Sequence, residues 1–307
     1  MTDPVAGING NIRGEWWVLA AAILWGTIGT AQAFGPDSAQ PAAIGALRLL
    51  FGGLALLAVA IFRGSLRPDK PWPKGWTLLS AGCVAAYQVC FFASVRISGV
   101  ATGTVVAIGS APILAGILAW VIRRERLSSR WMTSTALAIL GCTLMIGSQN
   151  DQGVVHLTGI VLALGAGLSY AAYTVTTKRI LENQAPEAVV AIVFSLGALI
   201  LLPILFKSNL EWLAQENGIA VVLHLSLIAT TLAYILFARG LQLIPVSTAV
   251  SLSLAEPLTA TILGIFILKE SFSWFSLLGM ALLFLGLVFL TSNPSRTAVR
   301  VRDPSSS

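Results

Sequence analysis

Blocks of about 20 predominantly apolar residues follow one another along this chain, and most of them contain no charged residue. An α-helix needs about 20 such residues to cross about 30 Å of hydrocarbon. It also bonds its own backbone polar groups internally, as a segment surrounded by lipid must. The ten blocks cover approximately residues 16–34, 42–62, 76–95, 102–122, 132–148, 157–177, 187–206, 218–238, 246–268 and 274–290. The sequence therefore predicts an all-α integral membrane protein with about ten transmembrane helices.

Charged residues are too few to solvate a globule of this length. They make up 10% of the 307 residues, and 56% of the chain is hydrophobic, whereas soluble domains carry about 25% charged residues. The net charge of +6 could indicate binding to nucleic acid, but the basic residues sit in short loops and form no stripe or recognised motif. We therefore expect a lipid bilayer, and no nucleic acid, as the partner of this surface.

The basic residues instead indicate how the chain is oriented. With the N-terminus placed inside, fifteen of the 19 basic residues fall in inside segments and three in outside segments. Short loops rich in Lys and Arg stay in the cytoplasm. The pattern predicts a multi-pass protein with both termini cytoplasmic. The sequence Ala31-Gln32-Ala33 resembles a signal-peptide cleavage site, but the repeat described next requires the first block as part of the fold.

The chain contains an internal repeat at an offset of 145 residues, and no gap is needed to align it. The aligned pairs are Gly14 with Gly159, Pro41 with Pro186, Gly52 with Gly197, Phe92 with Phe237, Ala93 with Ala238, Pro112 with Pro257, Glu125 with Glu270, Ser128 with Ser273, and Gly141 with Gly286. Each copy holds five spans, an odd number, so the two halves have inverted topology. Such a pair encloses a site near the midplane and permits alternating access, in which the site opens to one side at a time. We expect the halves at 1–148 and 149–290, followed by a cytoplasmic, disordered tail at 291–307.

Few residues could support catalysis or metal binding. The chain has three cysteines, an odd number, and all lie inside apolar blocks without the spacing of metal ligands: Cys83, Cys90 and Cys142. We therefore expect them to be packing residues and to form neither a disulfide nor a metal site. The chain has only two histidines and one acid near the centre of a span, too few for an enzyme active site. It also lacks a glycine-rich phosphate loop. We expect no cofactor and no enzymatic activity.

Several motifs resemble a known family. They are Pro112, the Arg-Arg-Glu triplet at 123–125 and Gly141, their second copy at Pro257, Leu-Lys-Glu at 268–270 and Gly286, and also Leu24-Trp25-Gly26 and Arg48. The pattern resembles the EamA-type members of the drug/metabolite transporter superfamily over nearly the whole chain, and is most similar to the YddG-type aromatic amino acid exporters. That resemblance implies an exporter of aromatic and other neutral amino acids in the bacterial inner membrane. Its substrate would be a small molecule, and a monomer is one option for its oligomeric state. A transporter of another metabolite or a drug remains the alternative within this fold, and a membrane scaffold or membrane enzyme the alternative outside it.

Aromatic residues mark a candidate cavity. Eight tryptophans lie near segment ends, as membrane interfaces favour, and only Trp25 lies at mid-helix. The four tyrosines, Tyr87, Tyr170, Tyr173 and Tyr234, all lie inside apolar blocks, where each hydroxyl needs a hydrogen-bond partner or a wet cavity. Trp25 and Tyr170 occupy matching positions in the two halves. We expect these side chains to line a central cavity; packing between helices is the alternative.

Ionisable and amide groups inside the spans are further candidates. Glu256 is the only carboxylate near the centre of a block, and its repeat partner is Ala111, so the shared fold does not require an acid there. A charge at that depth costs at least about 2.5–3.5 kcal/mol. Glu256 and Arg48 could bind the ammonium and carboxylate of an amino acid, Glu256 could carry a coupling proton, or the two could form a structural ion pair. Gln88 is a polar candidate for substrate contact or for bonding between helices.

Helix ends and prolines complete the candidates. Pro112 and Pro257 each remove a backbone hydrogen bond, which predicts a kink that serves gating or packing. Glu125 and Glu270 end their segments at the membrane surface. We expect these two carboxylates to make ion pairs or caps in contact with solvent.

Overall fold

The protein is helical throughout the part that the structure, a computed structural model, describes: residues 4–66, 70–147, 156–270 and 273–292. The predicted boundary between 148 and 149 lies outside these ranges. Of the predicted tail, 291–307, the first residue is the last of the final helix, and the residues from 293 onward lie outside the described ranges. The helices are α1 (Pro4–Ala33), α2 (Pro41–Phe62), α3 (Lys74–Ser98), α4 (Val100–Arg123), α5 (Ser129–Gly147), α6 (Leu157–Leu181), α7 (Pro186–Phe206), η1 (Glu211–Ala214), α8 (Glu216–Leu223), η2 (His224–Leu232), α9 (Ala233–Leu243), α10 (Val246–Leu252), α11 (Ala255–Phe266) and α12 (Trp274–Thr291).

These helices make about ten transmembrane segments. α8, η2 and α9 join into one segment, Glu216–Leu243, and α10 and α11 into another, Val246–Phe266. By length and composition, eight segments within the described residues could cross a membrane. The other two long helices, α1 and α5, are not among the eight, but they pack in the bundle against α9 and α12. The prediction of an all-α membrane protein with about ten spans is confirmed.

Helix starts follow local chemistry that the two halves share. α2 and α7 both begin at a proline, Pro41 and Pro186, because a first-turn residue needs no backbone N–H donor. α12 begins after Ser273, whose side chain accepts a hydrogen bond from the backbone N–H of Ser276. The chain turns between α3 and α4 at Gly99, whose φ of 82° favours glycine.

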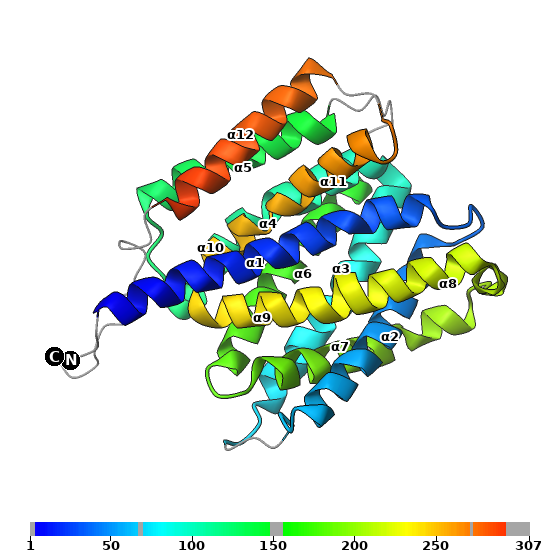
Figure 1. The fold of residues 1–307 in the computed structure, drawn as a ribbon, viewed down its shortest axis with the longest axis horizontal. Coiled ribbons are helices and arrows are strands. Elements are labelled where there is room, and N and C mark those ends of the chain that lie inside the picture. The colour runs from blue at the N-terminus through cyan, green and yellow to red at the C-terminus, as the bar shows by residue number, and fades with distance from the viewer. Residues whose placement is uncertain (1–3, 67–69, 148–155, 271–272, 293–307) are drawn as a thin grey trace.

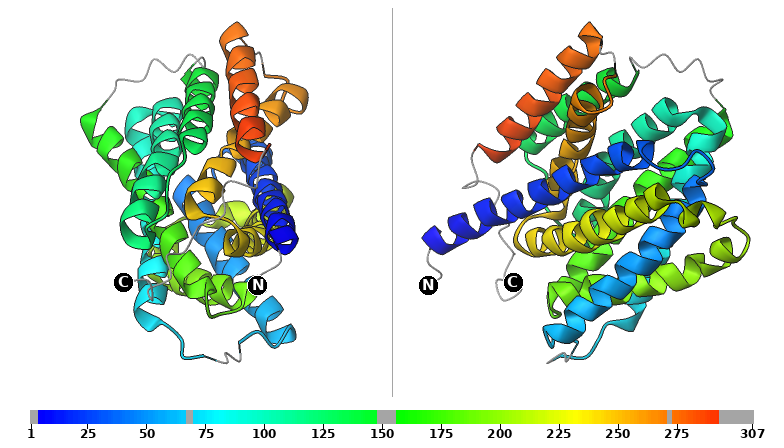
Figure 2. Two further views of the ribbon diagram at one scale, coloured as in Figure 1. Left: turned by 90° about the vertical axis from the view of Figure 1, so that its left-hand side faces the viewer. Right: turned by 45° about the vertical axis from the view of Figure 1, so that its right-hand side comes forward.

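The two halves pack against each other as a symmetric pair. α2 packs on its repeat counterpart α7, and α5 on its counterpart α12; Figures 1 and 2 show α5 and α12 side by side at one end of the molecule. The contact of α3 with α6 has its counterpart in the contact of η2 and α9 with α1. Likewise α4 packs on α6 as α11 packs on α1. Exchanging the halves therefore preserves the helix contacts, as two inverted repeats require.

Glycines let the α5–α12 pair approach backbone to backbone. A Cβ added to Gly141 would lie 2.5 Å from the backbone O of Gly279, and one added to Gly286 would lie 2.8 Å from the backbone O of Ser134. Gly141 and Gly286 are repeat partners, and so are the positions that they touch. Small residues allow such close contact between helices in a bilayer. The repeated glycine is therefore a packing residue at the interface of the two halves.

We predict that Gly286→Ala destabilises the protein, because the new methyl group would meet the α5 backbone, which cannot move aside as a side chain can. Overpacking of this kind costs about 1–3 kcal/mol, and we expect a lower melting temperature of the detergent-solubilised protein. Gly82→Ala is the matched control, since a Cβ on Gly82 meets nothing within 4 Å and alanine is the better helix former. Equal melting temperatures for the two variants would contradict the packing role of Gly286.

Candidate functional site

A narrow central cavity lies between the two halves, with about 290 Å³ of empty space that includes its openings to solvent. α2 and α3 contribute one side, and α6, α7 and α9 contribute the other. Its lining residues are Arg48, Leu49, Cys83, Val84, Tyr87, Gln88, Tyr170, Tyr173, Phe194 and Tyr234. Six of the eight predicted substrate-binding residues are among them, all except Trp25 and Glu256. The structure therefore brings residues from both halves to one cavity, as the inverted repeat predicts.

Aromatic rings form a continuous wall around this cavity. The ring centroids of Phe194 and Tyr234 lie 4.2 Å apart, and those of Tyr170 and Tyr173 lie 6.4 Å apart. Tyr87 on α3 approaches Tyr170 at 6.2 Å. These separations fall within or near the range in which aromatic pairs attract each other. The wall is thus a connected set of rings that presents flat apolar faces to the cavity.

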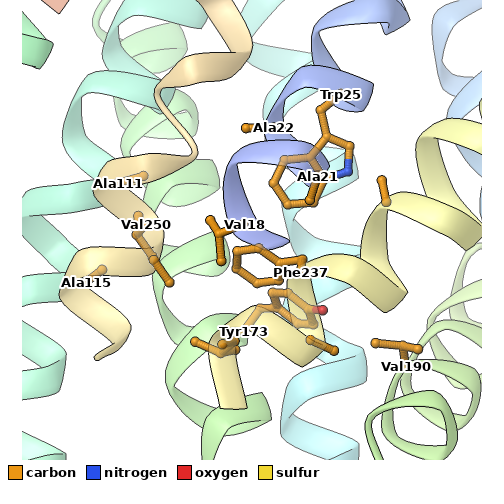
Figure 3. Packing of buried hydrophobic residues seen from close by; sticks show 14 of the residues in the cluster. Val18, Ala21, Ala22, Trp25, Ala111, Ala115, Tyr173, Val190, Phe237 and Val250 are labelled. Carbon is orange, nitrogen blue, oxygen red and sulfur yellow. The ribbon is translucent and has the colours of Figure 1, made fainter. Parts of the chain in front are cut away.

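Trp25 supports this wall from behind. Trp25 is 5% exposed, and its ring centroid lies 4.9 Å from that of Tyr234 and 5.2 Å from that of Phe237. Figure 3 shows Trp25 beside Phe237, with Tyr173 next to Phe237. Trp25 also meets Tyr170, its repeat partner, edge to face at 6.4 Å. Its Nε1 atom is buried without a hydrogen-bond partner among the described residues.

Arg48 is the cation of the cavity. It lies on α2 and lines the cavity, and its buried Nε atom has no hydrogen-bond partner among the described residues. Gln88, 4% exposed, is oriented by α2, since its Nε2 donates to the backbone O of Gly45 at 3.4 Å. A buried donor without a partner is costly, so the guanidinium is a group that a ligand could satisfy.

Glu256 lies near the cavity but not in its wall. It is in the first turn of α11, and its side chain is partly accessible. No carboxylate within the described ranges is within 4.0 Å of Arg48, so the structural ion pair with Glu256 is not formed here. Glu256 nevertheless lies close enough to Arg48, Tyr87 and Tyr234 for its charge to affect all three. An acid and a base thus lie near the same aromatic residues and form no direct ion pair.

The two prolines lie in different local structures. The helix ends at Leu252 and resumes at Ala255, so a short break directly precedes Glu256 and Pro257. The hydroxyl of Tyr170 donates to Ser253 Oγ in this break at 3.1 Å. Pro112, in contrast, lies inside α4, which is continuous from Val100 to Arg123. A role of either proline in gating stays a prediction.

Several residues of the site were not predicted from the sequence. Cys83, expected to be a packing residue, lines the cavity, and so do Leu49 and Phe194, which are repeat partners at the 145-residue offset. The repeat could have identified that pair, because matching positions on α2 and α7 meet where these helices cross.

The π-helical segment η2 also had no signal in the sequence. Two threonine hydroxyls stabilise it by donating to backbone carbonyls five residues earlier. Thr230 Oγ1 donates to Leu225 O and Thr231 Oγ1 to Ser226 O, both at 2.8 Å. Thr231 also donates to Gly52 O on α2 at 3.2 Å. π-Helical turns are frequent at functional sites. This one comes just before Tyr234 and therefore sets the rotation at which that ring enters the cavity.

Comparison with known proteins agrees with this architecture. The model of the EamA-like transporter family matches the chain twice, over residues 12–147 and 157–292. The uncharacterized transporter YwfM of Bacillus subtilis is 45% identical over 94% of this chain and 97% of its own length. The threonine/homoserine exporter RhtA of Escherichia coli is 30% identical over 92% of this chain and 90% of its own length.

A solved crystal structure shares the fold. It has a TM-score of 0.78 and 22% sequence identity, and the match covers 91% of this chain and 96% of the other. The family and these relatives are transporters and not enzymes, whereas the finer resemblance to YddG-type exporters stays a prediction. The two matches of the family model and the relatives that span the chain together show that this protein belongs to the EamA-like transporter family.

Proposed function

We propose that the protein is a secondary exporter of neutral amino acids, aromatic ones included, which pass through the central cavity by alternating access. The observation that carries this proposal is the arrangement of Arg48 and Glu256. They come from opposite halves, Arg48 lines the cavity, and Glu256 lies near enough to interact with the charge of Arg48 without forming an ion pair with it. A zwitterionic amino acid offers a carboxylate to the guanidinium, whose planar donors match it, and an ammonium to the acid.

The cavity wall limits the charge of the substrate. A highly charged metabolite is disfavoured, because Arg48 is the only basic residue among those that line the cavity. The space that the centres of water-sized molecules can reach is only about 20 Å³ in this structure, which is room for about one water molecule. In this proposal an amino acid therefore enters only when the two halves move apart, as alternating access requires.

The aromatic wall supports an apolar or flat side chain. Tyr170, Tyr173, Phe194 and Tyr234 present ring faces and edges, against which a phenyl or indole group could stack. Binding of this kind tolerates different apolar side chains, since it depends on buried area more than on fixed hydrogen bonds. We therefore expect several neutral amino acids to share the site.

A second candidate substrate class is that of small hydroxylated amino acids. RhtA, a threonine/homoserine exporter by name, is 30% identical to this chain. The two classes share the zwitterionic group and differ in the side chain, so they make the same demands on Arg48 and Glu256. A direct comparison of phenylalanine with threonine separates them.

The proposed export direction rests on the resemblance to amino acid exporters, such as the relative RhtA, and we expect the protein in the bacterial inner membrane with both termini in the cytoplasm. Export in this scheme draws on the substrate gradient or on coupled protons, with Glu256 as the candidate carrier of the proton. A pH gradient imposed across the membrane distinguishes the two, because only coupled transport would respond to it beyond the titration of the substrate.

The proposal is tested by counterflow in liposomes that contain the purified protein. Vesicles loaded with unlabelled phenylalanine should accumulate labelled phenylalanine transiently, and leucine or threonine should compete according to side-chain fit. Counterflow of an unmodified solute also separates transport from a scaffold or an enzyme. Exchange of cationic drugs with no exchange of any neutral amino acid would contradict the substrate class.

The roles of the two charged residues are tested by pairing variants with substrate analogues. Arg48→Gln should abolish the preference for tyrosine over its decarboxylated amine, because the cation no longer selects a carboxylate. Glu256→Gln should abolish the preference for tyrosine over the analogue that lacks the amino group. A charge-assisted hydrogen bond contributes about 1.5–3 kcal/mol, so we expect the affinity for tyrosine to fall by roughly 10- to 100-fold in each variant.

Lys207→Gln is the control for these variants, since Lys207 is an exposed charge after α7 that does not line the cavity. It should leave the discrimination between tyrosine and both analogues unchanged. The assignment is wrong if Arg48→Gln and Glu256→Gln slow the transport of tyrosine and of both analogues equally, because that result would indicate a structural role only.

A further inference from the structure

Glu125, the last residue of the Arg-Arg-Glu triplet at the end of α4, joins the two halves at one face of the molecule. Glu125 is 4% exposed, and its carboxylate accepts hydrogen bonds from the backbone N–H of Val246 at 3.2 Å and of Ser247 at 3.4 Å. Ser247 Oγ donates to it as well, at 3.3 Å. Glu125 therefore caps the N-terminus of the segment Val246–Phe266, where the first N–H groups lack partners within the helix and a negative charge is stabilised. The expected cap is present, but it is buried and not in contact with solvent.

The repeat partner of Glu125 has the same backbone and a different side-chain position. Arg124 and Lys269, which precede the two glutamates, have φ values of 54° and 60°, both in the left-handed region. The backbone N–H of Glu125 donates to Ala119 O and that of Glu270 to Gly264 O, both at 3.1 Å and again at matching positions. Yet Glu270 is exposed, and its carboxylate makes no hydrogen bond to any other described residue.

The segment that Glu270 would cap by symmetry is α4. The offset of 145 residues relates Ser247, which Glu125 caps, to Thr102 in the first turn of α4. Equivalent glutamates therefore lie at opposite faces of the inverted pair. In this structure Glu125 caps a helix, whereas Glu270 makes no such bond to a described residue.

Further polar contacts occur on the face of Glu125. The ammonium of Lys178 donates to the carbonyls of Leu241, Gln242 and Ile244 at the end of α9, at 2.5, 3.1 and 3.0 Å. Glu187, at the start of α7, pairs with Arg63 at 3.2 Å and also with Arg239.

These additional groups are not repeated at the other face. The residues that match Lys178, Glu187 and Arg239 in the first half are Ala33, Ala42 and Ser94. Of the groups named here, only the glutamate of the cap is present in both copies. The two faces therefore share the glutamate and differ in the other polar groups.

We propose that Glu125 and Glu270 are alternating gate residues of the transport cycle. Glu125 bound to the N-terminus of Val246–Phe266 holds its face closed, which the Lys/Arg pattern predicts to be the cytoplasmic face. When each half adopts the arrangement of the other, Glu125 is released and Glu270 caps the start of α4, which closes the opposite face. This inference rests on the transport function of the family and is independent of the identity of the substrate.

The proposal is tested with Cys83 as a native reporter, because it lines the cavity. Cys90 and Cys142 are replaced by alanine, and a membrane-impermeant maleimide is added to inside-out or right-side-out vesicles without substrate. Glu125→Ala should increase the labelling rate from the predicted cytoplasmic side and decrease it from the other side. Glu270→Ala should shift both rates in the opposite directions. Loss of an N-cap predicts a change of roughly 2- to 30-fold in the ratio of the two rates.

Three further variants make the result decisive. Glu216→Ala removes an exposed acid that lies outside both caps and should leave the ratio unchanged, whereas the double variant of Glu125 and Glu270 should return it toward the wild-type value. If Glu125→Ala does not fold, Glu125→Gln keeps a carbonyl acceptor and should shift the ratio in the same direction by a smaller factor. Shifts of the same sign for the Glu125 and Glu270 variants, or no shift for either, would overturn the proposal.

Discussion

A charged group at mid-depth of a bilayer is costly unless it is paired or hydrated, and this constraint shapes the centre of the molecule. Arg48 and Glu256 are not paired with each other within 4.0 Å. Arg48 lines the cavity between the halves, and Glu256 lies near it. The helix bundle therefore has to enclose a polar space between its halves. A transporter needs such a space, because charged residues that are not paired with each other remain available to bind a charged ligand.

Packing and chemistry use different positions of the repeat. Positions that the two halves share, such as Gly141 and Gly286, allow backbones to approach and fix how the halves meet. Positions that differ carry the charges, since Arg48 matches Val193 and Glu256 matches Ala111. Symmetry thus provides two equivalent arrangements of one scaffold, and asymmetry provides a single site between them. The glutamate pair Glu125 and Glu270 is the exception, because it is shared in sequence but engaged on one side only.

Much of the fold could be predicted from the sequence, because hydrophobic length and the 145-residue repeat are strong signals. The apolar blocks correspond to the observed spans, and six of the predicted site residues line the cavity. The cavity itself could be inferred because Trp25 and the tyrosines are polar-tipped aromatic residues at depths where lipid offers no hydrogen-bond partner.

What sequence reasoning missed depends on contacts between distant segments. The π-helical η2 is stabilised by threonine hydroxyls and by Gly52 of another helix, so no local pattern predicts it. The break before Glu256 and the burial of Glu125 depend in the same way on how the segment Val246–Phe266 meets its neighbours. Residue type alone did not distinguish Cys83, which lines the cavity, from Cys142, which is buried.

The central claim is that one cavity between inverted halves binds the two charged ends of an amino acid on residues from opposite halves. An experimental structure with a bound neutral amino acid tests it most directly. The account predicts the substrate carboxylate at the guanidinium of Arg48, the ammonium at Glu256, and the side chain against Tyr170 and Tyr234. A structure in which the amino acid binds elsewhere, while Arg48 and Glu256 pair with each other, would contradict it.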